Sequence, residues 1–261
     1  MSVTVNGASI VFDPNEFDGE TTLTIQPVNT DNTQNAGGSG TGNRVVSGAY
    51  DFTFTMNNTG VSQFDKPVQL RIPVQTGNTD PDLLALAKLA EDGSVEEYKT
   101  GVLNGDTYVG FTSTLSTYAI VENPVAFDDT ASVESWAGRA IRSIAAKGIV
   151  EGRRSGVFDP GANVTRAEFA KMLAKAAGIH GTSATETFDD VTETDWFQPY
   201  VAVLQKWGIT NGRGSTKIFA PHEFITRAEI ATMIARTLEL VNGQKSYSDA
   251  AAVLGKFKDQ D

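Results

Sequence analysis

Hydrophobic and polar positions follow two different patterns along the chain, and the change comes near residue 125. In the first half, short apolar runs recur between turn residues, which is typical of antiparallel β-structure. Residues 50–56 alternate between apolar and polar with period two, as a strand with one buried face does. We predict an immunoglobulin-like antiparallel β-sandwich. Its other strands are expected at 3–5, 10–12, 23–25, 68–74, 95–99, 108–111 and 117–121.

Turn signals and one ambiguous segment complete this prediction. Asn104-Gly105 predicts a hairpin loop, and Asp13-Pro14 and Asp92-Gly93 mark further turns. Residues 83–89 have the composition of a helix, but we predict a strand because strands surround them. Residues 29–43 contain no large apolar side chain and are predicted to be a mobile loop.

From Phe127 onward the apolar spacing becomes helical, and the sequence repeats itself after about 61 residues. The repeated segments are Phe127-Asp-Asp129 with Phe188-Asp-Asp190, Trp136 with Trp196, Gly148-Ile149 with Gly208-Ile209, Phe158-Asp-Pro160 with Phe219-Ala-Pro221, and Val164-Thr-Arg-Ala-Glu168 with Ile225-Thr-Arg-Ala-Glu229. A third copy is expected to begin at 247–249, which would give two complete repeats and the opening of a third.

Each repeat predicts a helix, a loop and a second helix. The first helix is expected over 136–147, with Gly148 as its left-handed C-terminal residue. The second helix opens at Thr165, and Thr165 with Glu168 fits a capping box, as Thr226 with Glu229 does in the next repeat. The residues expected to point inward are Phe169, Met172 and Leu173 in one repeat and Ile230, Met233 and Ile234 in the other.

Two arginines occupy the first position of these second helices. A cation is out of place there because the helix dipole favours an anion. Arg166 and Arg227 could therefore clamp a carboxylate or phosphate beside the free backbone N–H groups. The alternative is an ion pair with an aspartate of the neighbouring repeat. The sequence favours neither arrangement over the other.

Aromatic and loop residues of the repeats are open to two interpretations as well. Trp136 and Trp196 would be core residues in most proteins, but a half-exposed indole beside an arginine can hold a sugar ring. The same loop contains arginine, glycine and serine in both repeats. These residues either allow a ligand to approach the backbone closely or form a solvated turn. These loop residues are Arg153, Arg154, Ser155 and Gly156, and then Arg213, Gly214 and Ser215.

Charge and composition argue against several classes of partner and site. The chain has 21 Lys+Arg against 32 Asp+Glu, a net charge of −11, and 15 of the acids with only 5 bases lie in residues 1–126. This charge argues against nucleic acid as a partner. Cysteine is absent, which excludes disulfides and thiolate sites. No apolar run approaches the ~20 residues that span a bilayer, so we expect no membrane insertion. The first residues lack a signal-peptide pattern, so any signal peptide is expected upstream of Met1.

Catalytic and metal-binding patterns are missing from the sequence. His180 and His222 are the only histidines, and neither has a partner at the spacing of a metal site. The abundant carboxylates leave room for a glycosidase pair, but no pair stands in apolar surroundings that would raise one pKa. The pairs Asp128-Asp129 and Asp189-Asp190 lack the alternation of a calcium loop and are interpreted as turn caps. We therefore expect no enzyme, cofactor or metal site.

The repeated motif resembles the S-layer homology module of bacterial surface proteins. The resemblance implies a pseudo-threefold helical bundle, here incomplete, whose grooves bind secondary cell-wall polymers on peptidoglycan, often through a pyruvylated sugar. It also implies that Arg166 and Arg227 hold the acidic pyruvyl group, while Trp136, Trp196, Arg153, Arg213, Gly214 and Ser215 shape the sugar site. Residues 67–74 and 116–121 more weakly resemble the all-β modules that precede such repeats.

The predicted organisation is therefore a multidomain chain. It comprises an acidic β-sandwich spacer (1–124), repeat 1 (125–183), repeat 2 (184–244) and the start of a truncated third repeat (245–261). The expected function is non-catalytic anchoring of a surface protein in the cell wall or S-layer of a bacterium. Two alternatives stay open: the C-terminal anchoring fragment of a polysaccharide hydrolase, and a lattice protein that associates with itself in a surface layer.

Overall fold

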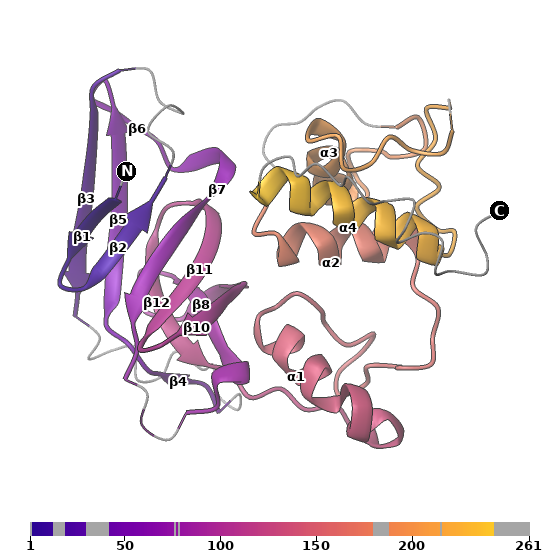
Figure 1. The fold of residues 1–261 in the computed structure, drawn as a ribbon, viewed down its shortest axis with the longest axis horizontal. Coiled ribbons are helices and arrows are strands. Elements are labelled where there is room, and N and C mark those ends of the chain that lie inside the picture. The colour runs from indigo at the N-terminus through magenta and orange to yellow at the C-terminus, as the bar shows by residue number, and fades with distance from the viewer. Residues whose placement is uncertain are drawn as a thin grey trace, which may run out of the picture.

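A computed structural model describes residues 2–12, 19–29, 42–75, 77, 79–179, 188–214 and 216–242. It has a β-rich part at the N-terminus and a helical part that follows it (Figure 1). We call strands β1 to β12 the β-module. The strands are β1 (Ser2–Val5), β2 (Ala8–Val11), β3 (Thr21–Val28), β4 (Arg44–Val45), β5 (Ala49–Met56), β6 (Thr59–Gly60), β7 (Gln63–Pro73), β8 (Leu84–Leu89), β9 (Val95–Lys99), β10 (Gly101–Asn104), β11 (Thr107–Thr114) and β12 (Thr117–Glu122).

These strands form two antiparallel sheets. One has the order β1-β2-β7-β11-β10, and the other has the order β3-β5-β12-β8-β9, with β4 paired to β12 and β6 to β5. The alternation predicted for residues 50–56 is present, since Tyr50, Phe52 and Phe54 are buried and Thr53 is exposed. One core contains residues of both sheets, among them Ile10, Leu70, Ile72, Phe52, Phe54, Leu86, Tyr118 and Ile120.

Two local predictions in the β-module are confirmed. Residues 84–89 form β8, so the strand interpretation of this segment is confirmed. Gly105, with φ +60, lies in the turn that joins β10 to β11, which confirms the predicted hairpin. Asp13-Pro14 and most of the predicted mobile loop (30–41) lie outside the described residues.

Four α-helices follow: α1 (Arg139–Ala146), α2 (Arg166–Ala176), α3 (Gln198–Lys206) and α4 (Arg227–Asn242). Gly148 and Gly208 follow α1 and α3 at φ +65 and +66, the left-handed conformation that ends helices. None of the described helices is long and apolar enough to cross a membrane. Short helical turns complete the fold at Pro81–Leu83, Ala131–Val133 and Glu134–Gly138.

Two helix predictions need correction. The first helix was expected from Trp136, but residues 134–138 form a wider π-type turn and α1 starts at Arg139. Ile234 was expected to point inward, yet its side chain is 40% exposed. Its side chain lines a cavity between the β-module and the helices. Met233, one position earlier, is buried as predicted.

The helical part has its own core, which α2, α3 and α4 share. Its buried residues include Ala170, Leu173, Phe188, Phe197, Val201, Leu204, Ile209, Phe219 and Met233. Helix α1 contributes no residue to this core and instead packs against the Pro81–Leu83 turn and β8. Figure 1 shows α1 apart from the group formed by α2, α3 and α4. The two repeats therefore differ in how their first helices are buried.

Candidate functional site

The paired aspartates at the start of each repeat fix the loop between its two helices. In repeat 2, the Asp190 carboxylate accepts hydrogen bonds from the backbone N–H groups of Phe219 (2.8 Å) and Ala220 (2.7 Å). In repeat 1, the Asp129 carboxylate accepts hydrogen bonds from the backbone N–H groups of Phe158 (2.9 Å) and Asp159 (2.7 Å). The turn-capping interpretation is thus confirmed for the second aspartate of each pair. No group of three His, Asp or Glu side chains in the described part of the chain could hold a metal ion.

Both predicted capping boxes are present. The Thr165 hydroxyl accepts from the Glu168 N–H at 3.2 Å, and the Glu168 carboxylate accepts from the Thr165 N–H at 2.7 Å. Thr226 and Glu229 make the same reciprocal pair at 3.2 and 2.9 Å. These residues fix where α2 and α4 begin, and so they fix the positions of the two arginines.

Arg166 is buried in the contact between the two repeats, with 2% of its surface exposed. Its Nε donates to the Phe219 carbonyl at 2.6 Å, and its Nη1 lies 2.5 Å from Oε1 of Glu229. The guanidinium also stands 4.8 Å from the centre of the Phe219 ring. Of the two arrangements considered for this arginine, the structure has the ion pair between repeats, with a glutamate in place of the expected aspartate.

Protonation of this ion pair is shifted by its surroundings. Partial burial of Glu229 opposes its ionisation, but hydrogen bonds from Thr226 and the charges of Arg166 and Arg213 outweigh it and lower the pKa of the carboxyl. Burial also lowers the pKa of Arg166, against the opposing effect of Glu229. Because the ordinary pKa of an arginine side chain lies far above neutral pH and that of Glu229 is lowered, the pair stays ionised at neutral pH.

The equivalent arginine of repeat 2 has a different environment. Arg227 is exposed and makes no ion pair with any residue that the structure describes. Arg213 lies near the first pair, 2.9 Å from Glu223 and 3.6 Å from Glu229. Gly214 follows at φ +60 with open space around it, and Ser215 is outside the described residues.

The tryptophans are surface residues. Trp136 is 78% exposed and Trp196 is 55% exposed, so neither indole is a core residue. Lys171 Nζ stands 5.9 Å from the Trp196 ring centre, and the same ammonium group is 3.0 Å from Glu151. Trp196 therefore offers an indole face beside a charged pair from the other repeat.

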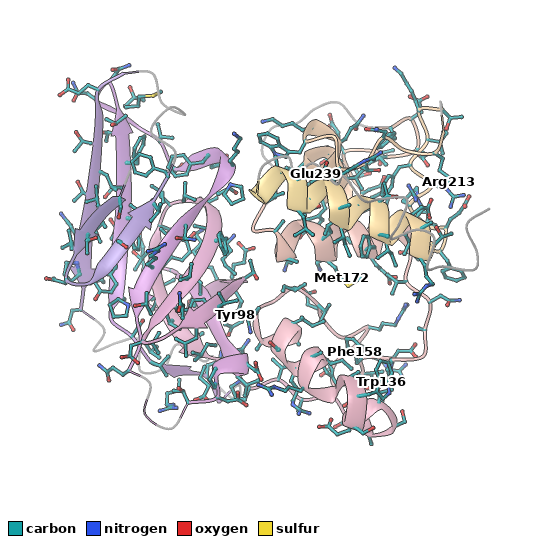
Figure 2. The ribbon with its side chains drawn as sticks, in the orientation of Figure 1. Tyr98, Trp136, Phe158, Met172, Arg213 and Glu239 are labelled. Atoms are coloured by element: carbon teal, nitrogen blue, oxygen red, sulfur yellow. The ribbon has the colours of Figure 1, made fainter. Side chains whose placement is uncertain are left out.

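A pocket of about 350 Å³ joins the two repeats at this point, and we call it the inter-repeat pocket. Arg153 reaches it from the repeat 1 loop, where Nη2 donates to the Asn163 carbonyl at 2.9 Å and Nη1 is 3.5 Å from Glu168. Figure 2 labels Phe158 and Met172, which line it, and Trp136, which does not. The lining is Ile149, Val150, Glu151, Gly152, Arg153, Phe158, Asp159, Pro160, Ala162, Val164, Glu168, Lys171, Met172 and Trp196.

The structure thus brings together Arg153 and Trp196 but leaves the other candidate residues elsewhere. Lys171 belongs to the pocket although the sequence analysis missed it. Helical spacing carries the signal that could have found it, because positions 168, 171 and 172 fall on one face of α2. The other candidate residues were recognised because they occur in both repeats, whereas Lys171 has no lysine counterpart in repeat 2.

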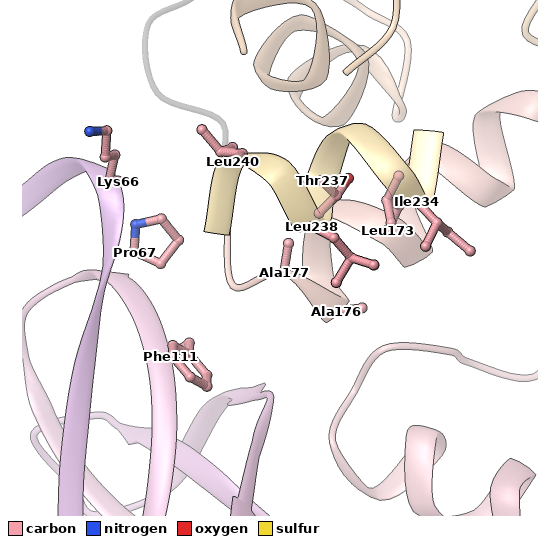
Figure 3. A pocket seen from close by; sticks show the side chains of 10 residues that line it. All are labelled: Lys66, Pro67, Phe111, Leu173, Ala176, Ala177, Ile234, Thr237, Leu238 and Leu240. Atoms are coloured by element: carbon pink, nitrogen blue, oxygen red, sulfur yellow. The ribbon is translucent and has the colours of Figure 1, made fainter. Parts of the chain in front are cut away.

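A second, larger cavity of about 500 Å³ lies between the β-module and the helices, and we call it the inter-module cavity (Figure 3). Its lining is Lys66, Pro67, Phe111, Leu173, Ala176, Ala177, Ile234, Thr237, Leu238 and Leu240. Among the described residues that line it, Lys66 is the only charged one and Phe111 the only aromatic one, and the rest are apolar except Thr237.

Comparison with known proteins agrees with the repeat structure. The family profile of the S-layer homology domain matches residues 126–170 and 187–231, one segment in each repeat. The chain contains two S-layer homology repeats. This domain implies anchoring to the cell wall and a place at the cell surface.

Several curated proteins resemble this S-layer homology chain. The S-layer protein sap of Bacillus anthracis is 32% identical over 157 residues, 57% of this chain and 18% of the relative. An amylopullulanase of Thermoanaerobacterium thermosulfurigenes is 29% identical over 195 residues, 74% of this chain and 10% of the relative. An endo-1,4-beta-xylanase A of Thermoanaerobacterium saccharolyticum is 37% identical over 106 residues, 41% of this chain and 9% of the relative.

The chain thus spans less than a fifth of the length of these relatives. The amylopullulanase match is longer than the segment from Phe127 to the C-terminus, so its similarity extends into the β-module. Relatives that are S-layer proteins and relatives that are hydrolases share this region.

Proposed function

We propose that this chain anchors a surface protein non-catalytically by binding an acidic, pyruvylated secondary cell-wall polysaccharide. The inter-repeat pocket carries the proposal, because it combines an exposed indole with cationic side chains from the other repeat. An indole face suits the apolar face of a sugar ring. A guanidinium suits a carboxylate such as a pyruvyl ketal.

Within the pocket, Arg153 is the proposed carboxylate ligand. Its guanidinium lies 3.5 Å from Glu168 and 3.8 Å from Asp159, which is long for ion pairs, and its side chain is partly exposed. A bound carboxylate can therefore displace them at small cost, since exposed ion pairs contribute little. Lys171 supplies a second positive charge, and Trp196 forms the platform for the ring.

Other candidate residues receive different roles in this proposal. Arg166 holds the two repeats together, because its guanidinium is already engaged and buried. Arg227 and Trp136 are exposed and are proposed to contact further sugar units of the long polymer outside the pocket. Arg213, Gly214 and Ser215 are proposed to do the same from the repeat 2 loop.

The wider organisation is also proposed. The two sheets would form an immunoglobulin-like β-sandwich over 1–124, and the helices over 125–244 would form the incomplete bundle of repeats 1 and 2, with a third beginning at 245. Because the relatives include both S-layer proteins and hydrolases, the anchored partner would be either a lattice-forming surface protein or a polysaccharide hydrolase.

The test is co-sedimentation with cell-wall sacculi that carry or lack their acid-labile secondary polymer. We expect retention only when the polymer is present. Trp196→Ala and Arg153→Ala should each weaken binding about tenfold, which corresponds to about 1.4 kcal/mol. Trp196→Phe should keep most of the affinity because it retains an aromatic face.

The matched control is Arg154→Ala, which removes an adjacent exposed arginine that does not line the pocket. Its binding should equal that of the unchanged chain. Removal of pyruvate from the polymer should abolish the difference between Arg153→Ala and the unchanged chain. Equal binding of Trp196→Ala and the unchanged chain to intact polymer would contradict the proposed site.

A further inference from the structure

Helix α1 is held by the β-module rather than by the helical core. The Asn123 side chain is buried and its Nδ2 donates to the Ala146 carbonyl at 2.8 Å, which satisfies a carbonyl at the C-terminus of α1. Lys147 Nζ donates to the Asp82 carbonyl at 2.7 Å, and Arg139 pairs with the Asp82 carboxylate. The contacts thus involve both ends of α1.

Two glycines of repeat 1 allow the backbones to approach closely. A Cβ on Gly148 would stand 3.1 Å from Cβ and 3.2 Å from the carbonyl oxygen of Tyr98 in β9. A Cβ on Gly178 would stand 2.9 Å from Cβ of Phe111 in β11. The equivalent of Gly148 in repeat 2 is Gly208, and no atom of the residues that the structure describes lies within 4 Å of a Cβ built there.

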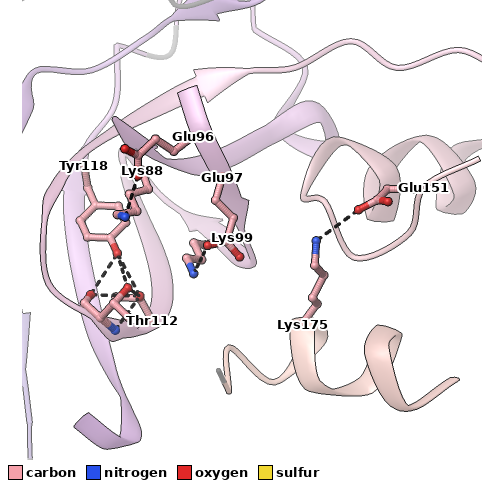
Figure 4. Close-up of polar contacts among 9 residues, drawn as sticks. Lys88, Glu96, Glu97, Lys99, Thr112, Tyr118, Glu151 and Lys175 are labelled. Atoms are coloured by element: carbon pink, nitrogen blue, oxygen red, sulfur yellow. Dashed lines mark hydrogen bonds and ion pairs between the residues drawn. The ribbon is translucent and has the colours of Figure 1, made fainter. Parts of the chain in front are cut away.

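The contact between Gly148 and Tyr98 also covers a strand at the edge of its sheet. Strand β9 is the last strand of its sheet, and its Lys99 is buried and paired with Glu97 at 2.6 Å (Figure 4). Across from it, Lys175 of α2 pairs with Glu151 at 3.4 Å. Sheet edges that lack a cover tend to pair with other chains, and proteins commonly protect them with a helix or loop.

The sequences of α1 and α3 match this difference in environment. The last two residues of α1, Ala145 and Ala146, are buried, whereas their counterparts in α3 are Gln205 and Lys206. Small apolar residues thus occupy the face of α1 that the β-module covers, and polar residues occupy the same face of α3.

From these contacts we propose that the β-module and repeat 1 form one rigid unit, which unfolds together with the whole helical part because α2 of repeat 1 shares its core with α3 and α4. The β-module is then not a loosely tethered spacer. It completes the burial of α1, and this contact fixes the orientation of the β-module relative to the helical part. It also supports Ile149 and Val150, which follow Gly148 and line the inter-repeat pocket. This proposal does not depend on polymer binding.

The experiment compares Gly148→Asn with Gly208→Asn. Asparagine tolerates the left-handed conformation, so both variants carry a similar small backbone cost, but only the side chain at 148 meets the β-module. All three tryptophans, Trp136, Trp196 and Trp207, lie in the helical part. Their fluorescence therefore reports unfolding of that part, whereas circular dichroism near 218 nm reports the sheets and the helices together, so an independently unfolding β-module would shift its midpoint away from that of the fluorescence.

In urea, the unchanged chain and Gly208→Asn should show coincident midpoints by the two probes, as a two-state unit does. Gly148→Asn should separate the midpoints by about 0.5 M or more. Coincident midpoints in Gly148→Asn, or separate midpoints already in the unchanged chain, would overturn the proposal.

A second measurement does not depend on any variant. Backbone ¹⁵N relaxation of the unchanged chain should give one rotational correlation time for the β-module and repeat 1. Two distinct correlation times would show that the parts tumble separately and would refute the rigid unit. Polymer is absent from both experiments, so their failure leaves the anchoring proposal untouched.

Discussion

At the scale of single residues, the same motif places equivalent arginines in different environments. Arg166 and Arg227 begin equivalent helices after equivalent threonines, yet one is buried against Phe219 and Glu229 and the other is exposed. The difference arises because Phe219 and Glu229 of repeat 2 enclose the Arg166 guanidinium, whereas the Arg227 side chain is exposed among the residues that the structure describes. A shared motif therefore fixes a residue's place on its helix but not its partners.

This difference gives a stability prediction. Arg166→Ala should destabilise the helical part by about 3 to 5 kcal/mol, because it leaves Glu229 without its buried partner. Arg227→Ala should change stability by less than about 0.5 kcal/mol, as exposed substitutions usually do. Urea unfolding followed by tryptophan fluorescence measures both. Equal stability of the two variants would show that the Arg166 ion pair contributes nothing.

At the scale of elements, one carboxylate per repeat organises the loop between two helices. Asp190 binds two consecutive N–H groups of the Phe219-Ala220 segment and so presents the Phe219 carbonyl to Arg166. Asp129 positions Phe158 in the same way, next to the inter-repeat pocket. The repeated aspartate is thus a structural element on which the pocket and the contact between repeats both depend.

The two aspartates of repeat 2 should therefore differ in their effect on stability. Asp190→Ala should cost about 1.5 to 3 kcal/mol, the usual range for hydrogen bonds to a charged group. Asp189→Ala is the matched control, because its exposed side chain makes no such pair of backbone contacts, and it should be nearly neutral. Thermal unfolding by circular dichroism compares them. A large loss of stability in Asp189→Ala would contradict the assignment.

At the scale of the whole molecule, charge is distributed unevenly. The net charge is −11, and residues 1–126 hold 15 acidic and 5 basic side chains. The candidate ligands Arg153 and Lys171 lie in the nearly neutral helical part. An acidic polymer would therefore meet local attraction at the pocket and long-range repulsion from the β-module.

This distribution makes a prediction about salt. The Debye length grows from about 8 Å at 0.15 M to about 30 Å at 0.01 M ionic strength, so low salt lets the acidic β-module act on the polymer. Association with an acidic polymer should then become slower as salt is removed. Surface-plasmon measurements of the association rate at the two ionic strengths test this. Faster association at low salt would show that local cations dominate the encounter.

Much of the local structure could be predicted from the sequence because short-range chemistry dictates it. Alternation over residues 50–56, the turn at Gly105 and the capping boxes at Thr165 and Thr226 all depend on neighbours within a few positions. The repeat itself identified the family. Errors came where a local pattern competed with its surroundings, as at the start of α1 and at Ile234.

The sequence by itself therefore determined the elements, the two-part organisation and the family. Only the tertiary structure decided that Arg166 is buried, that Trp196 meets Lys171 across the repeats, and that α1 packs on the β-module. The physical reason is that these contacts join residues tens of positions apart, such as Asn123 with Ala146 and Arg166 with Glu229. Their burial depends on how the elements pack, which no local pattern encodes.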